Sequence, residues 1–95
     1  MTHLFVRAIE KWGKQAQVRM LIEECGELIV QASKLWRESG SWEHFLEELV
    51  DVSIMLDQMK LIVPSEILKF WEDTKIAKLR RLEDLLEENA ERVTP

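Results

Sequence analysis

A chain of 95 residues is expected to form one small domain, residues 1–95, whose core is marginal unless the chain oligomerises. Its composition, 46% hydrophobic and 33% charged, excludes a disordered chain, and its net charge of −5 argues against nucleic acid or an anionic membrane as the main partner. The single cysteine excludes an intrachain disulfide, and the sequence has neither a signal-peptide pattern nor an apolar run of bilayer length. We therefore expect a soluble, cytoplasmic protein.

Glycine and proline divide the chain into helical lengths, and period-two strand patterns are absent. Gly13 ends the first predicted helix, Ser41 is the expected N-cap of the third, and Pro64 precedes the fourth. The first predicted helix is capped by Thr2 and ends at about residue 12, and the others span about residues 15–38, 42–61 and 66–91. Four amphipathic helices with short connections predict an all-α four-helix bundle.

Four carboxylates form two matched pairs, Glu24 with Glu27 and Glu48 with Asp51. Residues three apart lie on one face of a helix, where like charges destabilise it by a few tenths of a kcal/mol per pair. No lysine or arginine lies within one helical turn of either pair to relieve this repulsion. Two such helices packed face to face would collect four oxygen ligands, a set that favours Mg²⁺ or Mn²⁺ over zinc or copper.

The acid pairs are predicted to lie at the rim of the core. The second helix carries an apolar stripe from Val18 to Trp36, within which Trp36 is expected to pack. At about 100° per residue, Glu24 lies beside this stripe and Glu27 lies roughly 60° further out. In the same way Glu48 borders the apolar stripe of the third helix, with Asp51 further out. A single acid pair is common on exposed helices, but two pairs at the rim of successive helices are a stronger indication of a metal site.

The motifs resemble those of a known enzyme superfamily. Residues 23–28 read E-E-C-G-E-L after Trp12, Gly13 and Gln17, and residues 47–52 read E-E-L-V-D-V. This pattern, E-E-x-x-E followed by E-x-x-D, resembles the MazG-like all-α nucleoside triphosphate pyrophosphohydrolases. The resemblance extends over about residues 5–81 and is closest to the short, single-domain members of phages and mobile elements.

The resemblance implies a site and a reaction. Glu24, Glu27, Glu48 and Asp51 would be the catalytic carboxylates and metal ligands, with Mg²⁺ as cofactor and Mn²⁺ as a substitute. The reaction would be hydrolysis of a nucleoside triphosphate between the α and β phosphates, which gives a monophosphate and pyrophosphate. Several family members also carry a lysine with an asparagine one turn later in the last helix. Here Leu79 follows at that spacing, so this part of the pattern is incomplete.

Lysines on two helices are candidates for phosphate binding. On a helical wheel, Lys75 falls near the centre of the apolar stripe of the fourth helix and Lys78 falls at its edge. A lysine in an apolar stripe must snorkel, pair or bind a ligand. An ion pair between Glu72 and Lys75 is the structural alternative. Lys34 on the second helix is a further candidate, with a simple surface role as its alternative.

Three more side chains are candidates for contacts with substrate. Trp12 precedes one helix break and Trp42 follows another, so either could flank a pocket and stack on a base, and packing is the alternative for both. Gln17 shares the helix face of Glu24 and could hydrogen-bond to substrate or to a carboxylate.

The sequence thus predicts an oligomeric, cytoplasmic, Mg²⁺-dependent nucleoside triphosphate pyrophosphohydrolase that clears surplus or non-standard nucleotides. It would act as a homodimer or homotetramer, with no nucleic-acid or membrane partner. The alternative is a non-catalytic, acidic helical-bundle interaction protein, such as a phage or toxin-system accessory factor. That alternative predicts the same helices but gives the carboxylates at the rim no role.

Overall fold

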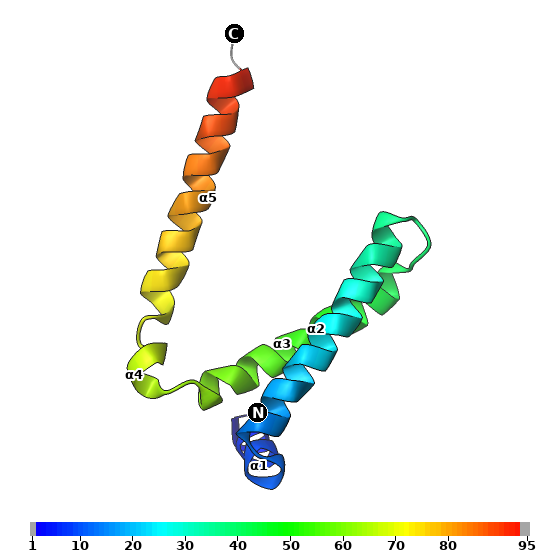
Figure 1. The fold of residues 1–95 in the computed structure, drawn as a ribbon, viewed down its shortest axis with the longest axis vertical. Coiled ribbons are helices and arrows are strands. Elements are labelled where there is room, and N and C mark those ends of the chain that lie inside the picture. The colour runs from blue at the N-terminus through cyan, green and yellow to red at the C-terminus, as the bar shows by residue number, and fades with distance from the viewer. Residues whose placement is uncertain (1, 94–95) are drawn as a thin grey trace. The chain divides into compact units, whose positions relative to one another are not determined.

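The chain is all-helical in its structure, a computed structural model that describes the backbone of residues 2–93 and the side chains of residues 2–88. The described residues contain no strand, and four long helices and one short one run along the chain (Figure 1). The helices are α1 (Thr2–Trp12), α2 (Lys14–Trp36), α3 (Trp42–Ile62), α4 (Ser65–Leu68) and α5 (Trp71–Val93). The all-α fold class predicted from the sequence is confirmed. None of the described helices is both long enough and apolar enough to cross a bilayer.

The chain divides between Val63 and Pro64 into two compact units, the first containing α1 to α3 and the second α4 and α5. Proline disfavours helical dihedral angles in the residue before it, and Val63 accordingly has φ −59° and ψ 131°. The expectation that residues 1–95 form a single domain stays a prediction.

The first break, between α1 and α2, depends on one glycine. The Gly13 N–H donates to the Ile9 carbonyl oxygen at 2.8 Å, which closes the last turn of α1. Gly13 then takes φ +88°, in the left-handed region that only glycine enters without strain. The predicted helix end at this position is confirmed.

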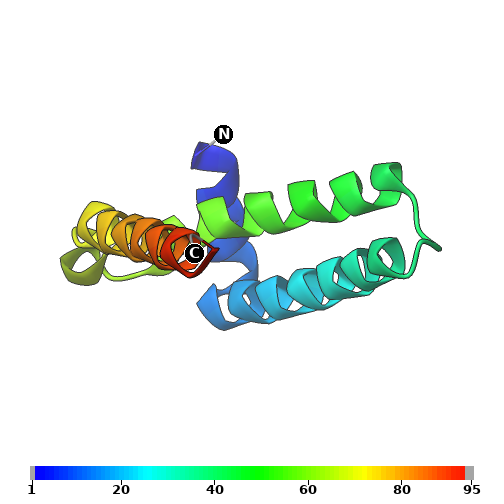
Figure 2. The same cartoon turned by 90° about the horizontal axis from the view of Figure 1, so that it is seen from above.

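Helices α2 and α3 lie side by side and antiparallel as a hairpin (cyan and green in Figure 2). In the turn between them, the Ser39 N–H donates to the Lys34 carbonyl oxygen at 2.9 Å. This hydrogen bond gives a partner to one of the carbonyl groups that the C-terminal end of α2 leaves unpaired. The Ser41 hydroxyl then accepts from the His44 N–H at 3.1 Å, so the predicted N-cap of the third helix is confirmed.

The prediction of one uninterrupted helix over residues 66–91 is wrong. Helices α4 and α5 are separated at Lys69 and Phe70, where the Phe70 N–H donates to the Ile67 carbonyl oxygen only three residues back, at 3.0 Å. Four-residue spacing resumes with the Thr74 N–H, which donates to the Phe70 oxygen at 2.9 Å. Neither residue at the interruption is glycine or proline, so the sequence carried no local signal for it.

The hairpin buries a narrow strip of side chains along the contact between its helices, here called the inner seam. Its members are buried or half-buried: Gln17, Leu21, Glu24, Leu28, Gln31 and Leu35 on α2, and Phe45, Glu48, Val52, Met55, Met59 and Ile62 on α3. Met55, 5% exposed, is the one hydrophobic side chain in the described residues that is fully buried. The hairpin alone therefore has almost no core.

The hairpin covers only part of the apolar stripe of the second helix, and the packing expected for Trp36 is not found within it. Ile22 and Ile29 are 67% and 68% exposed, and Trp36 is 88% exposed. A helix that contacts one antiparallel neighbour covers only the residues that face it, whereas this stripe is wider than one such contact.

Many of the exposed apolar residues of the hairpin lie on one side of it. Because α2 and α3 run in opposite directions, residues one position after the inner seam on either helix lie on the same side. On this side, here called the apolar face, the exposed residues are Val18, Ile22, Ile29 and Trp36 of α2 and Leu46, Leu49 and Leu56 of α3. Residues one position before the inner seam, which include Glu27, Asp51 and Gln58, lie on the opposite side, here called the site face.

Candidate metal centre

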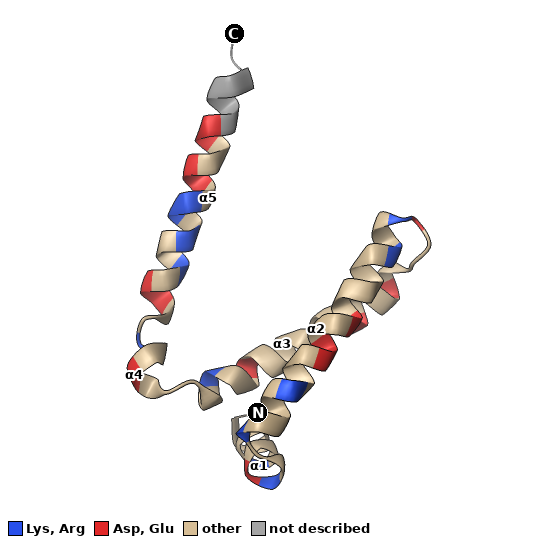
Figure 3. Ribbon diagram, viewed as in Figure 1, with Lys and Arg blue, Asp and Glu red and all other residues tan. Residues whose placement is uncertain are grey.

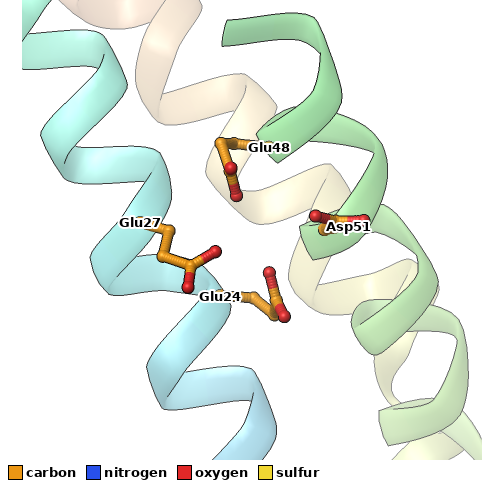
Figure 4. Close-up of side chains that lie close together, drawn as sticks. All are labelled: Glu24, Glu27, Glu48 and Asp51. Atoms are coloured by element: carbon orange, nitrogen blue, oxygen red, sulfur yellow. The ribbon is translucent and has the colours of Figure 1, made fainter. Parts of the chain in front are cut away.

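Four carboxylates from two helices meet midway along the hairpin. Glu24 and Glu27 come from α2, and Glu48 and Asp51 come from α3. One oxygen atom of each lies within 4.8 Å of the corresponding oxygen of every other. Their side chains point toward one another across the gap between the helices (Figure 4), and acidic positions of both helices adjoin in the same region of Figure 3. These four residues are called the acid cluster below.

The arrangement follows from spacing and antiparallel packing. Glu24 and Glu48 belong to the inner seam and are half-buried, whereas Glu27 and Asp51 are exposed on the site face. This division into inner and outer members is the one predicted from the helical wheel. Because the members of each pair are three residues apart, they lie on one face of their helix about 4.5 Å apart along its axis, and the antiparallel packing sets the two pairs opposite each other.

The inner carboxylates are held in unfavourable surroundings. Burial, followed by repulsion from Glu27 and then Asp51, raises the pKa of Glu24 above its ordinary value. Burial, followed by the interaction with Glu27, also raises the pKa of Glu48. Both shifts mean that the charged forms of these groups are disfavoured in the folded chain.

Two oxygen atoms of the acid cluster lack hydrogen-bond donors. Glu24 Oε2 and Glu48 Oε2 are buried and have no hydrogen-bond partner in the part of the chain that the structure describes. The nearest basic residue along α2, Arg19, instead approaches Glu23, with Nε and Oε1 3.8 Å apart. Buried carboxylate oxygens are normally paired, hydrogen-bonded or bound to metal. The acid cluster therefore fits a hard divalent cation, for which carboxylate oxygens are the preferred ligands.

Two of the predicted substrate residues lie near one another at one end of the hairpin. Gln17 is only 5% exposed in the inner seam, and Trp12 is 60% exposed at the end of α1. Both line a cavity of about 890 Å³ together with Met55 and Gln58. The structure thus brings a predicted aromatic residue and a predicted amide to the same cavity.

The other candidates lie elsewhere. Trp42, 72% exposed, is the first residue of α3, at the turn end of the hairpin, where its ring meets Phe45 edge-on with centroids 6.0 Å apart. Trp12 lies at the opposite end, so the two tryptophans do not share a cavity. Lys34 is exposed in the last turn of α2.

The remaining lysine candidates belong to the second unit. Lys75 and Lys78 are exposed on α5, where basic residues gather near the middle of the helix (Figure 3). The structure shows no ion pair between Glu72 and Lys75 among the described side chains, and this structural alternative for Lys75 stays a prediction. Contact of either lysine with phosphate stays a prediction.

Gln58 is the residue that sequence reasoning missed. It is 7% exposed, and its Oε1 atom is buried without a hydrogen-bond partner in the described residues. The available signal was its position seven residues after Asp51, where two helical turns return it to the same face as the acid. A polar residue at that position stands where an apolar one would pack better.

Comparisons with protein-family models, with curated proteins and with solved structures found no match for this chain. The residues of the chain and the geometry of the acid cluster are therefore what indicate its function.

Proposed function

We propose that this chain is a MazG-like, Mg²⁺-dependent nucleoside triphosphate pyrophosphohydrolase. The observation that supports this most strongly is the acid cluster, in which two buried oxygen atoms have no hydrogen-bond partner. A structural role for four mutually repelling carboxylates is hard to justify, because they destabilise the hairpin that carries them. The role of such an enzyme would be the removal of surplus or non-standard nucleotides.

In the proposed reaction, the parts of the site have different roles. The acid cluster would hold the cation. Bound Mg²⁺ would neutralise triphosphate charge and polarise a water molecule. A carboxylate of the acid cluster accepts a proton from that water as its oxygen attacks the α-phosphorus. The bond from the α-phosphorus to the bridging oxygen then breaks, and pyrophosphate leaves. Positioning and electrostatics supply most catalysis of phosphoryl transfer, so a small helical site is sufficient.

A panel of nucleoside triphosphates, assayed for pyrophosphate release with and without Mg²⁺, tests the proposal directly. We expect at least one triphosphate to give monophosphate and pyrophosphate in equal amounts, and only when Mg²⁺ or Mn²⁺ is present. Release of orthophosphate instead would contradict cleavage between the α and β phosphates. No turnover of any triphosphate would favour the alternative, a non-catalytic interaction protein, for which the apolar face would be the contact surface.

We also propose that the protein is a homodimer or homotetramer. The apolar face exposes aliphatic side chains over two helices, including Ile22 and Ile29, while the hairpin beneath it has one fully buried hydrophobic residue in its described part. A predominantly apolar surface can pair with a second copy of itself, as a two-fold interface requires. This face is opposite the acid cluster, so its burial leaves the carboxylates accessible.

Adjacent residues on opposite sides of α2 provide the test of assembly. Ile29→Glu places a charge on the apolar face and should reduce the mass measured by light scattering to that of the 11.3 kDa monomer at micromolar concentration. Val30→Glu, at a neighbouring residue that is 49% exposed on the other side, should leave the oligomer intact. A monomeric wild-type protein would exclude the proposed assembly.

A further inference from the structure

The cavity near the start of α2 is lined by a buried polar group with nothing to bind. The Gln58 Oε1 atom is buried and accepts no hydrogen bond from the described residues, although its side chain is one of the cavity walls. Gln17, equally buried, lines the same cavity from the facing helix. Leaving a buried carbonyl group unpaired is costly, and a hydrophobic residue in its place would remove that cost. Such a group is therefore expected where a ligand completes the hydrogen bond.

The cavity lies beside the acid cluster and on the same side of the hairpin. Gln58 follows Asp51 by seven residues, so the two share a face and are separated by two helical turns, about 10 Å along α3. Gln17 precedes Glu24 by the same interval on α2. A ligand seated in the cavity could therefore extend an anionic group to the acid cluster, a span of the order of that between a nucleobase and its phosphates.

The lining of the cavity suits a flat ring with a polar edge. Met20 and Met55 provide apolar surface, and Trp12, 60% exposed, offers a ring face at the end of α1. Aromatic side chains can stack on any of the nucleobases, because every base has a π-face. A glutamine carboxamide presents one donor and one acceptor side by side, the geometry that pairs with the edge of a base.

We propose that this cavity binds the base of a nucleoside triphosphate and that the Gln58 carboxamide hydrogen-bonds to the edge of the base. This inference rests on the proposed function, since it assigns a place to the base of the proposed substrate. Gln58 is a positioning and specificity residue in this assignment and does not touch the reacting phosphate. Trp12 covers one face of the ring.

The test compares nucleoside triphosphates with inorganic tripolyphosphate, which has the phosphates but no base. Gln58→Met keeps the length of the side chain and removes its hydrogen-bonding atoms. Its KM for the preferred nucleoside triphosphate should rise at least about tenfold with kcat nearly unchanged, because binding alone is lost. Its affinity for tripolyphosphate in the presence of Mg²⁺, measured by calorimetry, should equal that of the wild type. Asp57→Asn, at the exposed neighbouring residue, should leave both quantities unchanged.

A second variant tests the hydrogen bond itself. Gln58→Glu keeps the acceptor and loses the donor, so the preference among bases should shift toward guanine, adenine and cytosine, whose exocyclic amino groups donate, and away from thymine and uracil, which have none. An unchanged KM in Gln58→Met would overturn the inference, as would an equal loss of tripolyphosphate affinity, which would mark Gln58 as structural. A wild-type protein that binds no nucleoside triphosphate would also overturn it.

Failure of the inference and failure of the proposed function give different results. Turnover by the wild type, together with an unchanged KM in Gln58→Met, would support the proposed enzymatic function and contradict the proposed base site. Binding of nucleoside triphosphates that depends on Gln58, without release of pyrophosphate, would support the base site and contradict the reaction.

Discussion

Replacement of Glu24 or Glu48 by glutamine should reduce kcat/KM for pyrophosphate release at least about 100-fold, corresponding to about 2.7 kcal/mol of transition-state stabilisation. Each substitution removes one charged oxygen ligand while keeping the size of the side chain. The hairpin should not lose stability, because the variant also loses one of four mutually repelling charges. Pyrophosphate release and the helical signal in circular dichroism, measured on the same preparations, check both parts of this expectation.

Neighbouring acids provide matched controls for these variants. Glu43→Gln and Glu47→Gln remove the same charge from exposed side chains of α3 that lie outside the acid cluster and outside the neighbouring cavity, and should retain turnover. If the variants of the acid cluster unfold while these controls do not, the four carboxylates are structural. If all four variants turn over normally, the site lies elsewhere.

Without metal, the protein should lose stability as the pH rises from about 4 toward neutrality. The pKa of Glu24 and that of Glu48 are both raised above the ordinary value of 4.5, chiefly by burial and then by neighbouring carboxylates. A group that binds its proton more tightly in the folded state stabilises that state while protonated. This contribution is complete below the ordinary pKa and disappears as the pH passes through the raised pKa. Thermal melts in EDTA across this range measure the effect.

Added Mg²⁺ should reverse that loss at neutral pH. A ligand that binds only the folded state at 100 times its Kd contributes about 2.7 kcal/mol, which raises the Tm of a small domain by several degrees. Glu48→Gln should flatten the dependence of Tm on pH and weaken the response to Mg²⁺, since one ionising ligand is gone. A Tm of the wild type that is independent of pH and of Mg²⁺ would exclude the acid cluster as a metal site.

The acid cluster could be predicted from the sequence because it depends on local geometry. Spacing of three residues fixes which side chains share a face, and the position of Glu24 and Glu48 beside apolar stripes fixed them as the inner members. The N-cap at Ser41 and the break at Gly13 were also predictable, because side-chain chemistry or backbone conformation determines each one locally.

Features that depend on packing could not be predicted in the same way. The pattern of residues on α2 identified an apolar stripe but not how much of it one neighbouring helix would cover, so Trp36 was expected to pack and is exposed. The interruption at Lys69 has no local signal. Gln58 became recognisable only when its burial and its unpaired oxygen were known, because glutamine on an amphipathic helix is ordinarily a surface residue.

Gly13 joins the helix that contributes Trp12 to the cavity wall, α1, to the helices that carry the acid cluster, α2 and α3. The acid cluster is held entirely by α2 and α3, whereas Trp12, on the wall of the neighbouring cavity, belongs to α1 and is attached to the hairpin through one glycine. Changes in α1 can therefore reshape what fits beside the carboxylates without displacing the carboxylates themselves. Such a chain could evolve toward a new ligand through its first twelve residues alone while the chemistry of the hairpin stays constant.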